Sequence, residues 1–228
     1  MKIGIIAAMA AEIACYHQTI SQVTSKTIGP VSLYQGQYAG HEIYFVESGI
    51  GKVNASIATT CLALEDLDLI INTGSAGAVA DQLKVGDLVL ASQAAYHDVD
   101  ATAFGYAKGQ VPQMPASYPM YQNERLAQSI DRLSQTNLYQ GMIVSSDSFV
   151  ASQAEISRIQ REFPAALCTE MEGAAIAQTC YQFEIPCLII RAISDTAAQD
   201  ADVLFDEFID QAGRDSAQLT LKLIEEGI

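Results

Sequence analysis

Short apolar runs alternate along the chain with segments of helical periodicity. The runs predict strands, at residues 2–8, 42–48, 67–73, 86–91, 140–145, 165–170 and 185–193. Apolar residues at helical spacing predict helices, at residues 10–20, 53–65, 122–136, 153–162, 172–183 and 205–225. This alternation is typical of the α/β class. We expect a mixed, mostly parallel central sheet with helices on both faces.

Nothing along the chain marks a domain boundary. There is no internal repeat, low-complexity tract or charged linker, and 228 residues suffice for one large core. One domain over residues 1–228 is the simplest interpretation. The segment 96–121 differs, because it carries three of the six prolines and has no clear period. It predicts a long functional or interface loop.

The charge of the chain narrows the range of partners. It carries 27 acidic residues against 12 Lys and Arg, a formal charge of −15. Nucleic acid, anionic membranes and polyphosphates would meet a surface of like charge. No apolar run approaches the ~20 residues of a membrane span. The expected partner is a neutral or cationic small molecule, with neither nucleic acid nor membrane.

Cysteine and histidine placement gives no sign of a metal or disulfide framework. The five cysteines are isolated, mostly in apolar runs, and predict reduced core residues. We expect His17 and His41 at the surface and His97 in loop structure, so no metal or other cofactor is expected. The amino terminus mimics a signal peptide, yet the same residues make a sensible first strand. A cytoplasmic protein is therefore expected.

Three carboxylates follow predicted strands and suggest one active site. Glu12 follows the first strand, Glu172 follows the apolar approach from Ala165, and Asp195 ends the run from Ile185. In open α/β sheets ligands bind at the carboxyl ends of strands. Taken singly, Glu12 also fits a first-turn helix acid, and Asp195 fits a helix N-cap.

Charged residues near these acids carry their own constraints. Glu170 and Glu172 flank Met171, and in an extended segment they would face opposite ways. At most one would then enter the site directly, and the other would be structural or a helix cap. Arg191 lies inside an apolar strand and needs a nearby carboxylate, because a buried guanidinium without a partner is costly.

Two glycine-rich segments, predicted as turns, follow strands. They are Ser48-Gly-Ile-Gly-Lys-Val-Asn and Asn72-Thr-Gly-Ser-Ala-Gly. Glycine lets backbone amides approach a ligand, but neither segment is a Walker loop and the first lacks the third glycine of the dinucleotide fingerprint. Packing turns and ligand turns remain equally open on these segments alone.

Taken in order, the motifs resemble those of the nucleoside phosphorylase and nucleosidase superfamily, and within it the 5′-methylthioadenosine/S-adenosylhomocysteine nucleosidases. The resemblance covers nearly the whole chain. Its segments are Ile3-Gly-Ile-Ile-Ala-Ala-Met with Glu12, Ser48-Gly-Ile-Gly-Lys, Asn72-Thr-Gly-Ser-Ala-Gly, Tyr96-His-Asp-Val-Asp-Ala-Thr-Ala-Phe-Gly-Tyr, Ser145-Ser-Asp-Ser-Phe, Glu170-Met-Glu-Gly, Arg191-Ala-Ile-Ser-Asp and Phe205-Asp-Glu-Phe.

The resemblance implies hydrolysis of the bond between adenine and the ribose carbon. Asp195 would be the general acid that protonates the leaving purine. Glu12 would activate the attacking water, and Glu172 would hold the ribose hydroxyls as the sugar becomes cationic.

The resemblance also implies residues that bind the substrate around these acids. Met171 would lie against the sugar, and Arg191 and Ser75 near the water and the ribose. Phe149 would stack on adenine. The remaining implied positions are the Val150 backbone on the base, Ser194 beside Asp195, and Met9, Ile50 and Phe205 around the 5′-alkylthio group.

A neighbouring subunit would complete the site. In the family, the loop that holds Ala101, Phe104, Tyr106 and Pro112 reaches into the partner's site, which implies a homodimer. Ala101 is smaller than the valine often found there, and Ala10 and Ala11 stand where many relatives carry acids. The preference among methylthioadenosine, S-adenosylhomocysteine, 5′-deoxyadenosine and aminofutalosine-type nucleosides therefore stays open.

Three rival functions remain. A phosphorylase of the same fold needs cationic groups around phosphate, yet the stretch from Ala7 to Glu12 offers a carboxylate and no Lys or Arg. A non-catalytic nucleoside-binding protein has no need of three such acids together. A metal-dependent hydrolase lacks a cluster with ligand spacing. Hydrolysis of a nucleoside is favoured.

Overall fold

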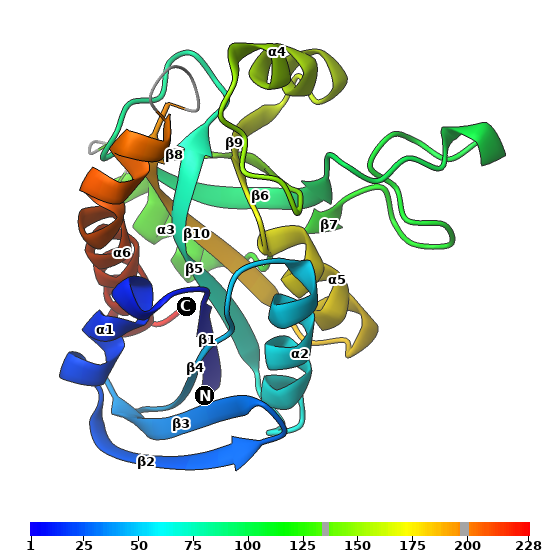
Figure 1. The fold of residues 1–228 in the computed structure, drawn as a ribbon. Helices are drawn as coiled ribbons and strands as arrows, with labels where there is room; N and C mark the ends of the chain where they lie inside the picture. The colour runs from blue at the N-terminus through cyan, green and yellow to red at the C-terminus, as the bar shows by residue number, and fades with distance from the viewer. Residues whose placement is uncertain (134–136, 197–200) are drawn as a thin grey trace.

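A twisted sheet runs through the centre of the molecule, with helices on both of its faces (Figure 1). This computed structural model describes the backbone of residues 1–133, 137–196 and 201–228. The strands are β1 (Lys2–Ala7), β2 (Ser21–Ile28), β3 (Val31–Tyr38), β4 (His41–Glu47), β5 (Leu69–Ala78), β6 (Leu88–Tyr96), β7 (Tyr118–Pro119), β8 (Leu138–Ser145), β9 (Ala166–Glu170) and β10 (Cys187–Asp195). The helices are α1 (Ala10–Thr19), α2 (Lys52–Ala63), α3 (Glu124–Leu133), α4 (Gln153–Glu162), α5 (Gly173–Gln182) and α6 (Ala201–Glu226), with a 3₁₀ turn at Thr102–Phe104.

The strand pairings close part of the sheet into a ring. Strands β5, β10, β6, β8 and β9 each pair with the next, and β9 pairs back to β5. From β5 the sheet continues through β1, β4, β3 and β2. Strand β5 thus pairs with β1, β9 and β10, and it joins the ring to the open part of the sheet.

Parallel pairing brings the ends of distant segments together. Strands β4, β1, β5 and β10 all run in the same direction. Their carboxyl ends therefore meet at one edge, where ligands bind in folds of this kind. Glu12 follows β1, Ser75 lies in β5 and Asp195 ends β10, so the topology alone places these three near each other.

The helices cover the sheet in two groups. Helix α6 packs on β10, β5 and α1 on one side, while α2 and α5 pack together on the other (Figure 1). Ile156 and Ile159 of α4 belong to a smaller apolar cluster with Val144 and Phe163. None of the helices in the described part of the chain is both long and apolar enough to cross a membrane.

The structure confirms the α/β class and the mixed sheet with helices on both faces, and it adds one hairpin. Strands β2 and β3 were not predicted. Almost every residue of β2 is exposed, so the strand has no buried face to produce an alternating pattern. It forms because its backbone pairs antiparallel with β3, from Ser21 opposite Gln37 to Ile28 opposite Val31.

Two local predictions were wrong. The segment Asn72–Gly77 is no turn, because β5 continues through it to Ala78. Two of its polar side chains bond to other parts of the chain: Asn72 Nδ2 donates to the carbonyl of Ile6 at 3.0 Å, and the Ser75 hydroxyl donates to Glu12 Oε1 at 3.0 Å. Asp195 is no helix N-cap either, since it is the last residue of β10 and α6 begins at Ala201.

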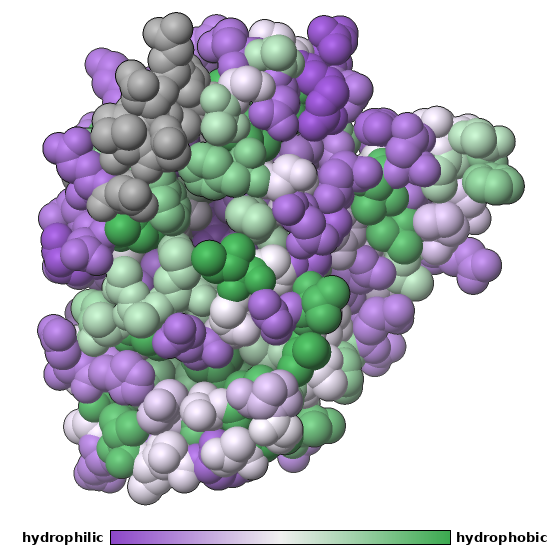
Figure 2. Space-filling view, viewed as in Figure 1, coloured by the Kyte–Doolittle hydropathy of each residue, from purple (hydrophilic) through white to green (hydrophobic). Residues whose placement is uncertain are grey.

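Residues 97–117, between β6 and β7, form an arm that projects from the body of the molecule (Figure 1). Of the predicted loop at 96–121, Tyr96 belongs to β6, and the short strand β7 and the 3₁₀ turn interrupt the rest. Hydrophilic and apolar side chains both cover the arm in the space-filling view (Figure 2). The prediction of a long loop here is confirmed in outline.

The core predicts a contrast between two valines that lie in strands. Val46 in β4 is fully buried between Ile6 of β1 and Leu33 of β3, whereas Val23 in β2 is 39% exposed. Both substitutions by alanine remove the same atoms and the same strand preference. Val46→Ala should lower the free energy of unfolding by about 1.5–3 kcal/mol, and Val23→Ala by about 0.5 kcal/mol. Urea unfolding followed by circular dichroism measures both, and equal losses would contradict the register of β4.

Candidate active site

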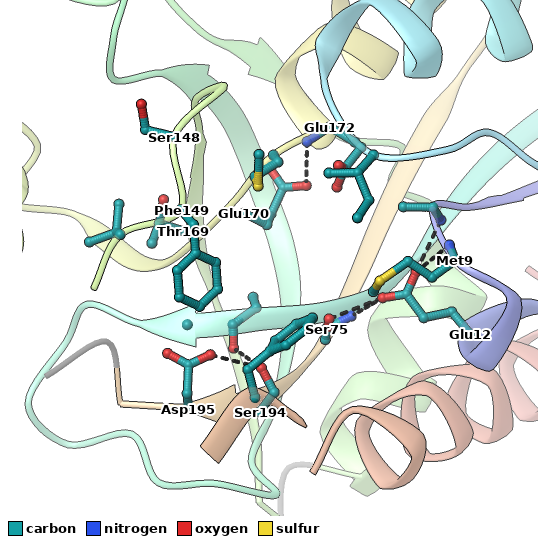
Figure 3. A pocket seen from close by; sticks show the side chains of 17 residues that line it. Met9, Glu12, Ser75, Ser148, Phe149, Thr169, Glu170, Glu172, Ser194 and Asp195 are labelled. Carbon is teal, nitrogen blue, oxygen red and sulfur yellow. Dashed lines mark hydrogen bonds between the residues drawn. The ribbon is translucent and has the colours of Figure 1, made fainter. Parts of the chain in front are cut away.

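A cavity of about 320 Å³ opens at the edge where the parallel strands end (Figure 3). It draws on segments from the whole length of the chain. Its walls are formed by Ala8, Met9, Glu12, Ile50, Ser75, Ala76, Gly77, Ser148, Phe149, Val150, Thr169, Glu170, Met171, Glu172, Ser194, Asp195 and Phe205.

Glu12 is fixed by four donors. Its Oε2 accepts hydrogen bonds from the backbone N–H groups of Ala8 at 3.0 Å and Met9 at 3.2 Å. Its Oε1 accepts from the backbone N–H of Ser75 at 2.9 Å and from the Ser75 hydroxyl at 3.0 Å. Glu12 is only 2% exposed. Glu12 lies in the first turn of α1, as the interpretation as a helix acid predicted. It also connects β5 to the start of that helix through its bonds with Ser75.

Arg191 lies behind the cavity and neutralises one of its acids. The guanidinium is buried and donates through Nη2 to Glu170 and to Asn72 Oδ1, the latter at 2.6 Å. Glu170 also accepts from the Ser145 hydroxyl and from the N–H groups of Glu172 and Gly173 at 3.1 and 2.7 Å. The predicted carboxylate partner of Arg191 is therefore Glu170.

Both Glu170 and Glu172 reach the cavity, so the expectation that at most one would do so was wrong. Strand β9 ends at Glu170, and the chain bends at Met171 and Glu172 before α5 begins. The alternation of an extended strand does not apply across this bend. The carboxylate of Glu170 already accepts hydrogen bonds from Arg191 and from backbone N–H groups, whereas Glu172 has fewer partners.

Glu172 is the acid whose titration the site changes most clearly. Its Oε1 accepts the N–H of Gly51 at 2.8 Å, and its Oε2 lies 3.9 Å from Arg191 Nη2. Burial, together with the nearby charge of Glu170, raises the pKa of Glu172 to about 7. A proton therefore binds to this carboxyl at a pH near neutrality.

Asp195 stands at the end of β10, across the cavity from Glu172 (Figure 3). It is 2% exposed, and the hydroxyl of Ser194 donates to its Oδ2 at 2.9 Å. Ser194 itself is fully buried. The side chain of Asp195 thus has a hydrogen-bonded orientation inside a largely apolar enclosure.

Apolar side chains make up the rest of the walls. Phe149 and Phe205 meet edge to face, with ring centroids 5.7 Å apart. Met9, Met171 and Ile50 lie around the space between these rings and the acids. Flat aromatic faces and flexible thioethers suit a planar heterocycle and a hydrophobic substituent.

The structure brings together most of the residues predicted for this site. The cavity includes all three predicted acids and nine predicted substrate contacts: Met9, Ile50, Ser75, Phe149, Val150, Met171, Glu172, Ser194 and Phe205, with Glu172 counted in both sets. Arg191 stands behind the wall. Phe104 and Pro112 lie on the arm, exposed, and do not line the cavity of their own chain.

Several residues that line the cavity were not predicted from the sequence. Ala8, Ala76, Gly77 and Ser148 lie in segments already noted for their motifs, and Thr169 directly precedes one, but small side chains give no signal of their own. His97 lies in the loop directly after β6, as expected, and it is buried, with its ring between Arg158 Nη2 at 3.1 Å and Thr169 Oγ1 at 3.2 Å. Its contact with Thr169 connects it to the cavity wall.

No candidate metal centre is found within the described residues. No group of three or more His, Cys, Asp or Glu side chains is arranged there to hold an ion. The carboxylates of the cavity have Arg191, backbone amides and hydroxyls as neighbours instead.

Comparison with known proteins gives the family. A model of the phosphorylase superfamily matches residues 2–225. The 5′-methylthioadenosine/S-adenosylhomocysteine nucleosidase of Staphylococcus carnosus is 44% identical over 98% of this chain and 99% of its own length.

Solved structures agree with this assignment. The S-adenosylhomocysteine nucleosidase of Streptococcus pyogenes, in complex with 5-methylthiotubericidin, has a TM-score of 0.96 at 42% identity and covers 100% of this chain and 98% of its own. The futalosine hydrolase of Helicobacter pylori has a TM-score of 0.93 at 32% identity and covers 99% of this chain and 98% of its own. The chain therefore belongs to the phosphorylase superfamily, among its 5′-methylthioadenosine/S-adenosylhomocysteine nucleosidases, which are N-glycosidic hydrolases.

Proposed function

We propose that this protein hydrolyses the N-glycosidic bond of 5′-methylthioadenosine and S-adenosylhomocysteine, releasing adenine and a thioribose. One observation carries the proposal: four carboxylates from three distant segments line one cavity, and aromatic, thioether and hydroxyl groups line the rest of it. The relatives named for these two substrates are similar over nearly the whole chain.

Asp195 is the proposed general acid. An adenine anion is a poor leaving group, and protonation of the purine as the bond breaks makes its departure easier. The enclosed position of Asp195 and the fixed hydrogen bond from Ser194 support this role. Phe149, with its ring against Phe205, supplies a face on which the purine stacks, next to the Val150 backbone.

Glu12 is the proposed acceptor of the proton of the attacking water. Its four donors hold the carboxylate in place on the wall opposite Phe149. The hydroxyl of Ser75 is the donor that can turn away, since rotation about its side chain breaks no backbone bond. A water then takes its place on Glu12 Oε1, and Ser75 is free to contact the ribose.

Glu172 is the proposed partner of the ribose hydroxyls, with Met171 against the sugar. A carboxyl that gains a full negative charge on losing its proton stabilises positive charge on the sugar ring, which develops only in the transition state. Its position beside the Gly51 amide and its raised pKa support this role.

Water, rather than phosphate, is the proposed nucleophile. The walls of the cavity contain no Lys or Arg among the described residues. Arg191 stands behind them and is paired with Glu170. A phosphate ion would therefore meet acids without a free cation to offset their charge.

The proposed assembly is a homodimer in which each arm completes the site of the other chain. Three apolar or aromatic residues are strongly exposed: Phe104 on the arm at 83%, Val53 on α2 at 71% and Tyr181 on α5 at 52%. Apolar side chains are visible over α2 in Figure 2. Met9, Ile50 and Phe205 then surround the 5′ substituent together with Phe104 and Pro112 of the second copy.

A cytoplasmic location is part of the same proposal. All five cysteines are free thiols, and four of them are buried. Reduced thiols of this kind are typical of proteins kept in a reducing compartment.

The nucleophile decides between hydrolase and phosphorylase. Purified protein incubated with 5′-methylthioadenosine in phosphate-free buffer should release adenine and free 5-methylthioribose at an undiminished rate. Liquid chromatography of both products, with and without added phosphate, makes the measurement. Release that requires phosphate and yields a sugar phosphate would make the enzyme a phosphorylase and remove Glu12 from its role.

Asp195→Asn should abolish most turnover while leaving the fold intact. The amide preserves size and hydrogen bonding but supplies no acidic proton, so kcat should fall by about 10²–10⁴-fold. Ser194→Ala is the matched control, because it removes the 2.9 Å bond to Asp195 and leaves the acid in place. Its kcat should fall by about 10-fold or less. An unchanged kcat in Asp195→Asn would contradict the role of Asp195 as the general acid.

The raised pKa of Glu172 predicts a stability change with pH. Between the ordinary value of 4.5 and about 7, the folded state keeps a proton that the unfolded chain has lost. This stabilises the fold fully below 4.5 and is lost as the pH rises through 7. Glu172→Gln stays neutral, so relative to the wild type it should gain roughly 1–3 kcal/mol of unfolding free energy between pH 5 and pH 8.

Urea unfolding of the wild type and Glu172→Gln at pH 5 and pH 8 tests this stability change. Glu226→Gln serves as a control of opposite sign, because the Ser129 hydroxyl and Arg132 lower the pKa of Glu226. That variant should lose stability relative to the wild type as the pH rises from 3 to 6. A Glu172→Gln difference that is constant from pH 5 to 8 would contradict the inferred protonation.

A further inference from the structure

A second charged cluster lies beside the active site and lines none of it. Lys52, the first residue of α2, places its Nζ 2.7 Å from Asp98 Oδ2 and 3.4 Å from Asp147 Oδ2. Asp98 follows β6, and Asp147 follows β8. One ammonium group thus connects three segments that are distant in the sequence.

Backbone amides tie the same three segments more closely. The N–H of Lys52 donates to Asp147 Oδ1 at 2.9 Å, and the N–H of Asp147 donates to Asp98 Oδ2 at 3.1 Å. Asp147 therefore caps the amino terminus of α2 from another part of the chain, where a carboxylate is favoured.

The cluster connects directly to two walls of the cavity. The amide next to that of Lys52, the N–H of Gly51, donates to Glu172 Oε1 at 2.8 Å. Asp147 comes two residues before Phe149, and Phe149 and Val150 line the cavity. The consecutive amides of Gly51 and Lys52, at the start of α2, thus hold the acid on one wall and the turn that carries the aromatic ring on another.

The charges of the cluster explain why Lys52 is needed. The Asp147 N–H donates to Asp98, so the two carboxylates lie close together and would repel each other without a cation between them. Burial acts to raise the pKa of Asp98, but the bonds from Lys52 and from the Asp147 N–H outweigh it and lower the pKa. The ammonium also lies 5.3 Å from the centroid of the Tyr96 ring, whose hydroxyl donates to Gln178 on α5 at 2.6 Å.

We propose that Lys52, Asp98 and Asp147, here called the Lys52 clasp, position the turn at 147–150 against Glu172 and thereby determine how tightly the enzyme binds its nucleoside. The inference rests on the function proposed above for the cavity. Lys52 contacts neither substrate nor reacting atoms, so it is a positioning residue. Removing it loosens the stacking wall while Asp195, Glu12 and their own bonds stay in place.

The expected effect falls on KM rather than on kcat. Side-chain exposure of 20% for Lys52, 30% for Asp98 and 55% for Asp147 means that solvent screens the pairs in part. Lys52→Met keeps the length of the side chain and removes its charge. It should raise KM for 5′-methylthioadenosine by about 10-fold, which corresponds to about 1.4 kcal/mol, and change kcat by no more than about threefold.

A matched control separates the clasp from surface charge in general. Lys26 forms an ion pair of 2.7 Å with Glu65 and lies away from the cavity. Lys26→Met should leave KM and kcat unchanged. Lys52→Arg restores the charge and should reverse at least half of the rise in KM on a logarithmic scale.

Hydrogen exchange reports the clasp without any substrate. In the unliganded Lys52→Met protein, peptides covering 146–150 and 50–53 should exchange faster than in the wild type, whereas Lys26→Met should match the wild type. Unchanged exchange together with a KM within twofold of the wild type would overturn the proposal. So would a fall in kcat with KM unchanged, which would place Lys52 in the chemistry.

Two further outcomes have a defined meaning. If Lys52→Met does not fold, Asp147→Asn replaces it and should show the same rise in KM and the same faster exchange. A wild-type protein that releases no adenine overturns the proposed function alone, because the exchange measurement still decides whether the clasp holds the turn.

Discussion

The buried guanidinium of Arg191 is the constraint around which the site is arranged. It lies in β10 and is bonded to Glu170 at the end of β9 and to Asn72 in β5, so it joins three strands of the ring. Gly74 leaves room for it, since a Cβ there would clash with the guanidinium and lie 2.7 Å from Glu12 Oε1. A buried cation of this kind is stable only with such partners, so Glu170 and Asn72 are fixed wherever Arg191 is.

This pairing leaves an excess of acid in the cavity. Glu170 pairs with Arg191, and Glu172 is left 3.9 Å from Arg191 with the like charge of Glu170 beside it. Burial and that like charge make ionisation of Glu172 unfavourable near neutral pH, which is a cost to the fold. Such a cost is typical of functional sites, where groups are held ready for charge that develops only during reaction. The Lys52 clasp holds the walls of this cavity from outside, where its charges do not add to those within.

The sequence predicted the fold well where burial leaves a pattern and poorly where it does not. Buried strands such as β1, β4 and β10 appear as apolar runs, and helix α4 matches its predicted bounds. The exposed strand β2 could not be found, because backbone pairing alone defines it. In β5 the polar residues from Asn72 to Ser75 were taken for a turn, although they are buried, and Asn72 and Ser75 bond to Ile6 of β1 and Glu12 of α1.

By itself, the sequence determined the fold class, three of the acids that line the cavity and most of its apolar walls. The reason is that motifs which follow parallel strands come together at the carboxyl edge of the sheet in any fold of this topology. Only the tertiary structure decided which acid neutralises Arg191, since a bend at Met171 and Glu172 turns both Glu170 and Glu172 toward the cavity. It alone placed His97 in the interior and joined Lys52 to Asp98 and Asp147. These contacts link residues 46 to 95 positions apart, and no local pattern of residues encodes which distant charges meet.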